Sequence, residues 1–336
     1  MRAAVVEAAR TVVVRDVGEP VPDGRAIVEL SHGGLCGTDL KIVAGAIPVA
    51  LPRVLGHELV GTVIEPGHAG LVEPGSRVLV DPGVACGHCV LCLADRGHLC
   101  RNGALLGRDV DGGFAQRLAV DERQLHVLPD RIGDKEAPVL QVLSTCVHAQ
   151  TLVDVFPGQV AVVVGLGVSG LLHLQLLLSR GVGTVIGVSR SPGKLRLART
   201  LGAAAAVTPD EARAAVTDIT AGHGADLVVE CVGTVSTFGH AVELAGMGST
   251  VLLFGTITDR QGELPFYQLY FKELDVRSSR AARPRDYARA IQLAASGAVR
   301  TAELVTSSFP LSEIAAALAA CEHDPSQLKV TLDISS

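Results

Sequence analysis

The most constraining feature of this sequence is a glycine-rich turn that joins an apolar run to a helical pattern. The run VAVVV occupies residues 160–164, and GLGVSG follows at 165–170. A short, continuous apolar run is typical of a strand buried in a parallel sheet. In such a turn Gly165 permits the tight bend, Gly167 lets a pyrophosphate approach the backbone, and Gly170 lets the helix pack on the strand. The motif predicts a strand–turn–helix unit that binds a dinucleotide.

Strands and helices alternate through the middle of the chain. A helical stretch begins near Pro138, and Pro157-Gly158 ends it. Because such alternation is typical of parallel sheets, we expect a doubly wound α/β fold with helices on both faces. Its strands are predicted at 160–164, 184–188, 225–229 and 250–254, and its helices at 169–180 and 192–201. The N-terminus of the first of these helices, with Val168 directly before it, presents amide donors to a phosphate.

The two ends of the chain have a different pattern of apolar runs and turns. Before residue 138, short β-rich runs such as 26–30 and 77–80 are separated by turns rich in glycine and proline. This pattern predicts an irregular, mostly β domain. After about residue 280 we expect helices at 285–296 and 311–321 and a final strand at 329–333.

Four of the eight cysteines are clustered, with spacings of two, two and seven residues: Cys86, Cys89, Cys92 and Cys100. Four thiolates close a tetrahedral zinc site and leave no position for a substrate, so the predicted zinc is structural. Disulfides are the alternative, but Cys-x-x-Cys pairs in a chain without a signal peptide more often hold metal. His88 and His98 lie among the cysteines and are expected outside the ligand set.

Composition excludes several classes of protein. Hydrophobic residues make up 48% and charged residues 19% of 336 residues, which excludes disorder as the main state. The net charge of -6 argues against nucleic acid as a partner and against a zinc finger that binds it. No apolar run reaches the roughly 18 residues that a membrane span requires, and the N-terminus lacks the core of a signal peptide. We therefore expect a soluble cytoplasmic protein.

The second strand of the α/β region indicates the cofactor. An acidic residue usually grips the ribose 2′-hydroxyl about 20 residues after the glycine turn. Here Ser189 occupies that position, Arg190 follows it, and Lys194 lies nearby. Because a guanidinium can bind a 2′-phosphate that a carboxylate would repel, NADP(H) is favoured. NAD(H) stays open, with Arg190 and Lys194 then part of a solvated face.

Together these features resemble the zinc-dependent medium-chain dehydrogenase/reductase family, in its alcohol, polyol and sugar dehydrogenase branch. The resemblance rests on CGTDL at 36–40, GHE at 56–58, the four cysteines, GGFA at 112–115 and the glycine turn, in that order. It implies a Rossmann domain and a mostly β, GroES-like catalytic domain formed by both chain ends. The expected boundaries are 1–142, with the zinc lobe at 86–100, then 143–280, and a return to the first domain at 281–336.

The resemblance also implies a second, catalytic zinc, with Cys36 and His57 as ligands. Thiolate and imidazole suit zinc, which activates an alcohol or carbonyl oxygen as a Lewis acid. Glu58 either ligates the metal or lies close to it, and Asp39 orients the histidine. Gln141 stands where relatives usually carry a cysteine or glutamate ligand. Because an amide oxygen is a weaker donor, a metal-free or loosely metallated site is the alternative.

Three further roles follow from the resemblance alone. Thr38 matches the hydroxyl that bonds the substrate oxygen and starts proton transfer. Lys41 stands at the position of a proton-relaying histidine. Since lysine has a reference pKa of about 10.4, relay and simple ribose binding stay open. Lys329 matches a cation that contacts cofactor phosphate. Cys146 is expected to serve packing rather than metal binding.

The leading expectation is hydride transfer between NADP(H), or NAD(H), and a secondary alcohol, polyol or sugar, with two zinc ions per chain. One alternative is a reductase of a carbonyl, imine or activated alkene with an altered or absent catalytic zinc. Another is a non-catalytic module that binds NADP. The expected partners are a small-molecule substrate and further copies of the chain, as a tetramer or dimer, with no nucleic acid and no membrane.

Overall fold

The computed structural model describes residues 1–259 and 261–335. The chain divides into two compact units. The first, here called the β unit, comprises Met1–Ser144, Arg283–Ser296 and the chain from Thr301 onward. The second, the α/β unit, comprises Thr145–Ala282 and Gly297–Arg300. Within the described residues, no helix combines the length and the apolar character that crossing a membrane would require.

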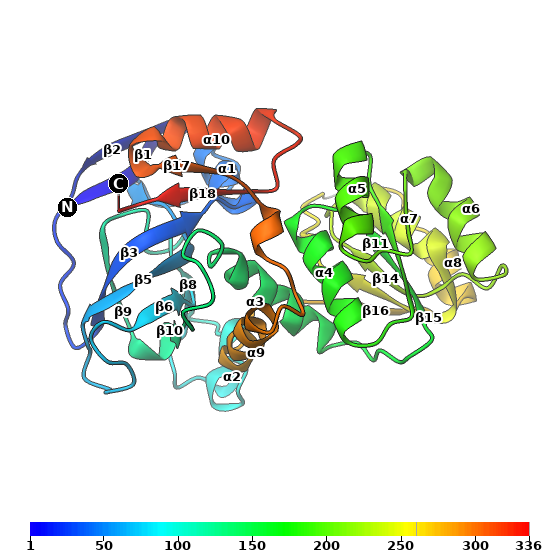
Figure 1. Ribbon diagram of the computed structural model, residues 1–336, viewed down its shortest axis with the longest axis horizontal. Coiled ribbons are helices and arrows are strands. Elements are labelled where there is room, and N and C mark those ends of the chain that lie inside the picture. The colour runs from blue at the N-terminus through cyan, green and yellow to red at the C-terminus, as the bar shows by residue number, and fades with distance from the viewer. Residues whose placement is uncertain (260, 336) are drawn as a thin grey trace. The chain divides into compact units, whose positions relative to one another are not determined.

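The β unit is built on a seven-stranded sheet with the order β10-β6-β5-β3-β18-β17, in which β9 also pairs with β3. Figure 1 shows that β18, from the C-terminal segment, lies beside β3 from the N-terminal segment. The strands are β3 (Ala26–Gly34), β5 (Glu58–Glu65), β6 (Arg77–Val80), β9 (Arg117–Val120), β10 (Leu125–Val127), β17 (Val305–Pro310) and β18 (Lys329–Asp333). The two chain ends therefore complete one sheet.

Smaller elements complete the β unit. A three-stranded sheet has the order β2-β1-β4, and β7 pairs with β8. These strands are β1 (Arg2–Ala8), β2 (Thr11–Asp16), β4 (Arg53–Val54), β7 (Gly83–Val84) and β8 (Ala104–Leu105). The helices are α1 (Gly37–Val43), α2 (Val90–Leu93), α9 (Pro284–Ala295), α10 (Ile314–His323) and α3 (Val139–Gln150), which continues from the β unit into the α/β unit.

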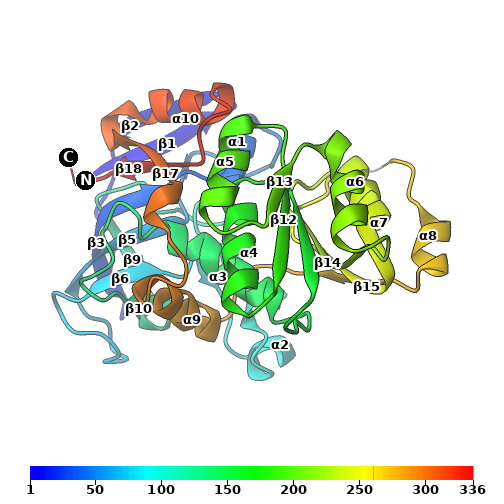
Figure 2. The same ribbon diagram turned by 45° about the vertical axis from the view of Figure 1, so that its right-hand side comes forward.

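The α/β unit contains a parallel six-stranded sheet with the order β13-β12-β11-β14-β15-β16. In Figure 2, α4 and α5 lie on one face of this sheet and α6 and α7 on the other. The strands are β11 (Val160–Val164), β12 (Thr184–Val188), β13 (Ala205–Val207), β14 (Ala225–Glu230), β15 (Ala245–Leu253) and β16 (Asp275–Ser278). The helices are α4 (Val168–Ser179), α5 (Pro192–Thr200), α6 (Pro209–Ile219), α7 (Val235–Leu244) and α8 (Phe266–Phe271).

This architecture confirms the predicted fold class. The VAVVV run forms β11, and its central residues are fully buried because the sheet is covered on both faces. The strands at 160–164, 184–188 and 329–333 have the predicted bounds. The predicted helix at 311–321 is a short turn at Leu311–Glu313 followed by α10. Strands β13 and β16 and helices α6, α7 and α8 were not predicted.

Candidate functional site

Three of the four residues predicted to hold a catalytic metal come together in the β unit. Cys36 lies between β3 and α1, His57 lies just before β5, and Glu58 is the first residue of β5. One ligand atom from each of the three lies within 4.8 Å of the others. His57 and Glu58 are buried, and Cys36 is half-buried. The fold thus places a thiol, an imidazole and a carboxylate at one spot.

Glycine residues make room for this cluster. Gly56 has a φ of +101°, and a side chain there would collide with the buried ring of Phe114. The Phe114 N–H donates to the carbonyl of Leu55 at 2.8 Å. A side chain on Gly34 would collide with the carboxylate of Glu58. The GHE and GGFA motifs are therefore two parts of one packing arrangement beneath the cluster.

Asp39 orients His57 and caps α1. Its Oδ2 accepts the N–H of Cys36 at 2.9 Å, and its Oδ1 lies 3.5 Å from Nδ1 of His57. This contact leaves Nε2 of His57 as the nitrogen available to a metal. Burial lowers the pKa of His57, but the negative charges of Asp39 and Cys36 outweigh it and raise the pKa well above its usual value. The site therefore favours positive charge.

Thr38 and Lys41 both lie on α1. The hydroxyl of Thr38 lies 3.8 Å from the sulfur of Cys36, so it is close to the cluster. Lys41 follows three residues later on the same helix and is exposed. Residues with this spacing share one face of a helix.

The structure places Lys329 beside the cluster of Cys36, His57 and Glu58, whereas the sequence predicted a contact with the cofactor phosphate. Its ammonium is buried and donates to both carboxylate oxygens of Glu58, at 2.8 and 2.6 Å, and to the carbonyl of Leu35 at 2.9 Å. Lysine has three N–H donors, so all are used. The predicted phosphate contact is therefore not supported, because no donor is left for it. Burial lowers the pKa of Lys329, but the charge of Glu58 raises it further, so Lys329 stays charged and neutralises Glu58.

These residues fit a zinc ion. Thiolate and imidazole are its usual protein donors, and the Glu58 oxygens keep lone pairs beyond those that Lys329 uses. Cys36, Asp39 and Glu58 lie around a single buried lysine, Lys329. With Cys36 as a thiolate, their negative charge exceeds that of the lysine, and a bound cation would balance it. The donor set is consistent with the predicted catalytic zinc.

Gln141 lies in the first turn of α3. The helix follows Pro138, whose Cβ would lie 3.1 Å from a Cβ on Gly34. Gly34 also contacts Glu58. The Tyr287 side chain of α9 is near enough to Gln141 for the amide to lower the pKa of the phenol, although burial raises that pKa overall. Gln141 as a metal ligand stays a prediction.

The four-cysteine cluster has the geometry of a structural zinc site. Separations between its sulfur atoms are 3.4, 3.5, 3.8 and 3.9 Å. In a tetrahedron with Zn–S bonds of about 2.3 Å, the sulfurs lie about 3.8 Å apart. Burial raises the pKa of Cys92 to about 12, whereas the N–H of Cys92 lowers the pKa of Cys89 to about 6. His88 is exposed and contacts the Cys86 carbonyl, outside the sulfur cluster.

The glycine turn of the α/β unit has the predicted conformation. Gly165 has a φ of +92°, and a side chain on Gly170 would collide with the carbonyl of Gly165. Gly167 precedes α4, and a Cβ there would meet no atom within 4 Å. The first N–H groups of α4, beginning with Val168, therefore border open space. Such a cradle fits a dinucleotide pyrophosphate.

The residues that follow β12 carry no carboxylate. The N–H of Ser191 donates to Oγ of Ser189 at 3.2 Å, so the serine is part of a local turn. Arg190 is exposed. Lys194 lies in α5 and is half-buried, and burial lowers its pKa. Cys146, predicted to serve packing, is fully buried in α3 with its sulfur 3.8 Å from the Ser169 carbonyl.

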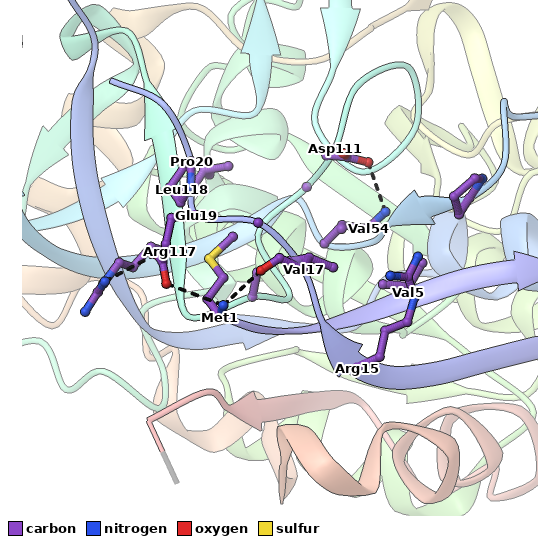
Figure 3. A pocket seen from close by; sticks show the side chains of 14 residues that line it. Met1, Val5, Arg15, Val17, Glu19, Pro20, Val54, Asp111, Arg117 and Leu118 are labelled. Atoms are coloured by element: carbon purple, nitrogen blue, oxygen red, sulfur yellow. Dashed lines mark hydrogen bonds and ion pairs between the residues drawn. The ribbon is translucent and has the colours of Figure 1, made fainter. Parts of the chain in front are cut away.

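A half-open pocket of about 330 Å³ lies elsewhere in the β unit, beside β1. Figure 3 shows that its polar groups bond one another. The Met1 ammonium lies 3.4 Å from Glu19 and donates to the Val17 carbonyl at 2.9 Å, and Arg117 pairs with Glu19 at 3.2 Å. None of the predicted site residues lines this pocket.

Comparisons with known proteins agree with this description. Residues 22–130 match the family model of the alcohol dehydrogenase GroES-like domain, and residues 168–296 match that of the zinc-binding dehydrogenases. A sorbitol dehydrogenase from Halalkalibacterium halodurans is 31% identical over 89% of this chain and 89% of its own.

Solved structures give the same result. A zinc-binding dehydrogenase from Sinorhizobium meliloti 1021 bound to NADP is 32% identical, with a TM-score of 0.91 over 99% of both chains. An alcohol dehydrogenase from Escherichia coli CFT073 with NADH is 26% identical, with a TM-score of 0.91 over 99% of both chains. The chain thus belongs to the zinc-binding medium-chain dehydrogenase family, and the predicted resemblance is confirmed. It is an oxidoreductase of the alcohol and polyol dehydrogenase type, which acts on CH–OH groups with NAD(P).

Proposed function

We propose that the protein is a zinc-dependent dehydrogenase that transfers a hydride between NADP(H) and a secondary alcohol, polyol or sugar, or the matching ketone. The observation that carries this proposal is the buried cluster of Cys36, His57 and Glu58. The α/β unit of the same chain carries the dinucleotide turn. The sorbitol dehydrogenase among its relatives supports a polyol-type substrate.

Cys36 and His57 would hold the catalytic zinc, with Glu58 and Gln141 as oxygen donors. A bound zinc supplies a Lewis acid that lowers the pKa of an alcohol or polarises a carbonyl. Asp39 fixes the imidazole of His57 through Nδ1. Lys329 balances the charge of Glu58 and holds its carboxylate in one orientation.

The chain's own groups would move the proton. Thr38, whose hydroxyl lies 3.8 Å from the ligand sulfur, would accept the proton of the substrate hydroxyl in oxidation while it passes its own proton on toward solvent, and the two transfers would run in reverse in reduction. Lys41 is exposed one helical turn away and can pass a proton to solvent or bond the cofactor ribose. Because hydride leaves with the cofactor, the proton is the only other species that must leave the substrate.

NADP(H) is the preferred cofactor in this proposal. Arg190 is exposed directly after β12, and Ser189 is uncharged, so a 2′-phosphate meets a guanidinium and no carboxylate. The relative from Sinorhizobium meliloti was crystallised with NADP, whereas that from Escherichia coli was crystallised with NADH. NAD(H) is therefore the alternative cofactor, and Arg190 is the residue that distinguishes them.

The sheet edge of the α/β unit supports a homo-oligomer. Strand β16 is an edge strand, and all four of its residues are exposed. Antiparallel pairing with a second copy, centred on Val276, would place Asp275 of each copy opposite Arg277 of the other. We infer a dimer through this edge, as such or within a tetramer. The Cys-x-x-Cys spacing, which suits a metal site rather than a disulfide framework, favours a cytoplasmic location.

Turnover of a panel of polyols and secondary alcohols with NADP⁺ tests the proposal. The zinc-loaded protein should oxidise members of the panel, and Cys36→Ser should lose turnover while retaining NADPH binding. Undiminished turnover in Cys36→Ser would remove Cys36 from the site. Reduction of a carbonyl, imine or activated alkene without a catalytic zinc would favour the second candidate, which the weak donor Gln141 supports. NADPH binding without any turnover would indicate a binding module.

A further inference from the structure

A buried carboxylate lies at the carboxyl end of β14, in the α/β unit, and no step proposed above uses it. It belongs to Glu230, the last residue of β14, whose side chain is fully buried. Its Oε1 accepts the N–H of Val232 at 2.7 Å and that of Gly233 at 2.9 Å. The same oxygen accepts the hydroxyl proton of Thr237 at 2.8 Å. Three donors of the segment that follows β14 therefore converge on one carboxylate oxygen.

Glu230 also joins this segment to the end of the next strand. Residues 231–234, here called the β14 loop, connect β14 to α7. The backbone carbonyl of Glu230 accepts the N–H of Gly255, two residues after β15, at 2.9 Å. A Cβ on Gly255 would lie 2.3 Å from the nitrogen of Gly233 and 2.6 Å from Oε2 of Glu230. The β14 loop and the chain after β15 are thus packed tightly around Glu230.

The β14 loop lies where the topology of the sheet places a ligand. The chain runs from β11 through β12 to β13 at one edge, and then crosses to β14, β15 and β16 on the other side of β11. Parallel sheets of this kind bind ligands in the crevice at such a reversal, outside the carboxyl ends of the strands. The glycine turn at 165–170 follows β11, which pairs with β14. The β14 loop is therefore the second wall of the crevice that the glycine turn begins.

The two walls are in direct contact. A Cβ on Gly165 would lie 2.5 Å from Cγ2 of Val232, so the valine packs against the glycine turn. The side chain of Val232 is apolar and yet 50% exposed. The backbone N–H of this valine is one of the donors that Glu230 holds. Glu230 thus fixes the residue that borders the phosphate-binding turn.

We propose that Glu230 is a positioning residue for the dinucleotide, whose carboxylate holds the β14 loop in place as the second wall of the cofactor crevice. The inference rests on the proposed function, because it takes the glycine turn as the cofactor site. Without the carboxylate, the N–H groups of Val232 and Gly233 lose their acceptor and the loop is free to move. If the freed loop occupies its binding position for about 1 to 10% of the time, cofactor affinity falls about 10- to 100-fold.

Fluorescence titrations of the zinc-loaded protein with NADPH and with NADH test this inference. Glu230→Met keeps an unbranched side chain but removes the acceptors, so it should weaken both cofactors by about 10- to 100-fold. Glu230→Gln keeps Oε1, the oxygen that accepts all three bonds, and should stay within about threefold of wild type. Glu211→Met is the matched control. Glu211 accepts the N–H and the hydroxyl of Thr208, both at 2.9 Å, at the start of α6, and its loss should change affinity less than about twofold.

Hydrogen exchange of the cofactor-free protein distinguishes a loosened loop from a loosened unit. In Glu230→Met the amides of residues 231–237 should exchange faster, while those of β11 keep their protection. Thr237→Val removes one of the three donors and is the milder variant, with an expected loss of NADPH affinity of about two- to fivefold. Far-UV circular dichroism and the melting temperature show whether each variant is folded. If Glu230→Met does not fold, Thr237→Val decides, and undiminished affinity in that variant overturns the inference.

The outcomes separate the inference from the proposed function. If residues 231–237 exchange faster in Glu230→Met but NADPH binds as in wild type, the inference alone is overturned and the glycine turn stays the cofactor site. Equal losses in Glu230→Met and Glu230→Gln also overturn it, since they indicate the charge rather than the hydrogen bonds. Faster exchange throughout the α/β unit overturns it as well, because the role is then merely structural. If wild-type protein binds neither cofactor, the proposed function itself fails, and the inference fails with it.

Discussion

The α/β unit should lose stability in mild acid because of one buried histidine. His173, in α4, is fully buried and packs edge-on against Phe254 with centroids 4.7 Å apart. Its Nδ1 lies 3.1 Å from Nε2 of Gln150, which donates to it. Within the described chain, its Nε2 has no hydrogen-bond partner. Burial lowers the pKa of His173 to about 3.

The sign and size of the effect follow from that pKa. The usual pKa of histidine is about 6.5. Between about pH 6.5 and pH 3 the unfolded chain binds a proton at this residue and the native chain does not. The free energy of unfolding therefore falls as the pH falls through this window. Between pH 7 and pH 5 the loss from this residue is about 2 kcal/mol.

Urea unfolding of the zinc-loaded protein at pH 7 and pH 5 measures the effect. His173→Asn keeps an acceptor for Gln150 but cannot titrate, so its loss of stability between the two pH values should be smaller than that of wild type by about 2 kcal/mol. His323→Asn, at a side chain that is 74% exposed, is the control and should lose as much as wild type. Identical losses in wild type and His173→Asn would refute the reasoning.

Three further predictions concern the choice of cofactor, the four-cysteine zinc lobe and the proposed homo-oligomer. Arg190→Ala should weaken NADPH binding by about 10-fold or more and leave NADH binding within about twofold, in fluorescence titrations, because a charged hydrogen bond to phosphate is lost; equal effects on both would contradict the cofactor assignment. Cys92→Ser should remove one zinc per chain and lower the melting temperature, since three thiolates no longer close the tetrahedron; an unchanged zinc content would contradict the four-sulfur site. Arg277→Asp should place like charges opposite each other at β16 and reduce the mass found by light scattering; an unchanged mass would exclude this edge as the interface.

The sequence predicted those parts of the site whose conformation and chemistry depend on residues that are close together in the chain. In the 165–170 turn, Gly165 is required by its positive φ, and Gly170 is required because it packs closely against the carbonyl of Gly165. The glycine pattern therefore predicts the conformation of the turn. The close spacing of the four cysteines likewise predicts that they lie in a single lobe. The cluster of Cys36, His57 and Glu58 followed from the family resemblance, because nothing within 36–58 alone indicates that the three side chains converge.

Long-range contacts could not be predicted in this way. Lys329 is 271 residues from Glu58, and Tyr287 is 206 residues from Asp81. No periodicity or spacing connects such residues, and only the pairing of β18 with β3 and the return of α9 to the β unit bring them together. The unpredicted helix α6 is a different case, since Thr208 and Glu211 form a capping box that the sequence displays.

Zinc content is the most direct test of the account. Elemental analysis of active wild-type protein should find two zinc ions per chain, and Cys36→Ser should retain one, in the four-cysteine lobe. Zinc anomalous scattering should place the second ion beside Cys36 and His57. Active protein with one zinc per chain, and nothing bound at Cys36 and His57, would contradict the account.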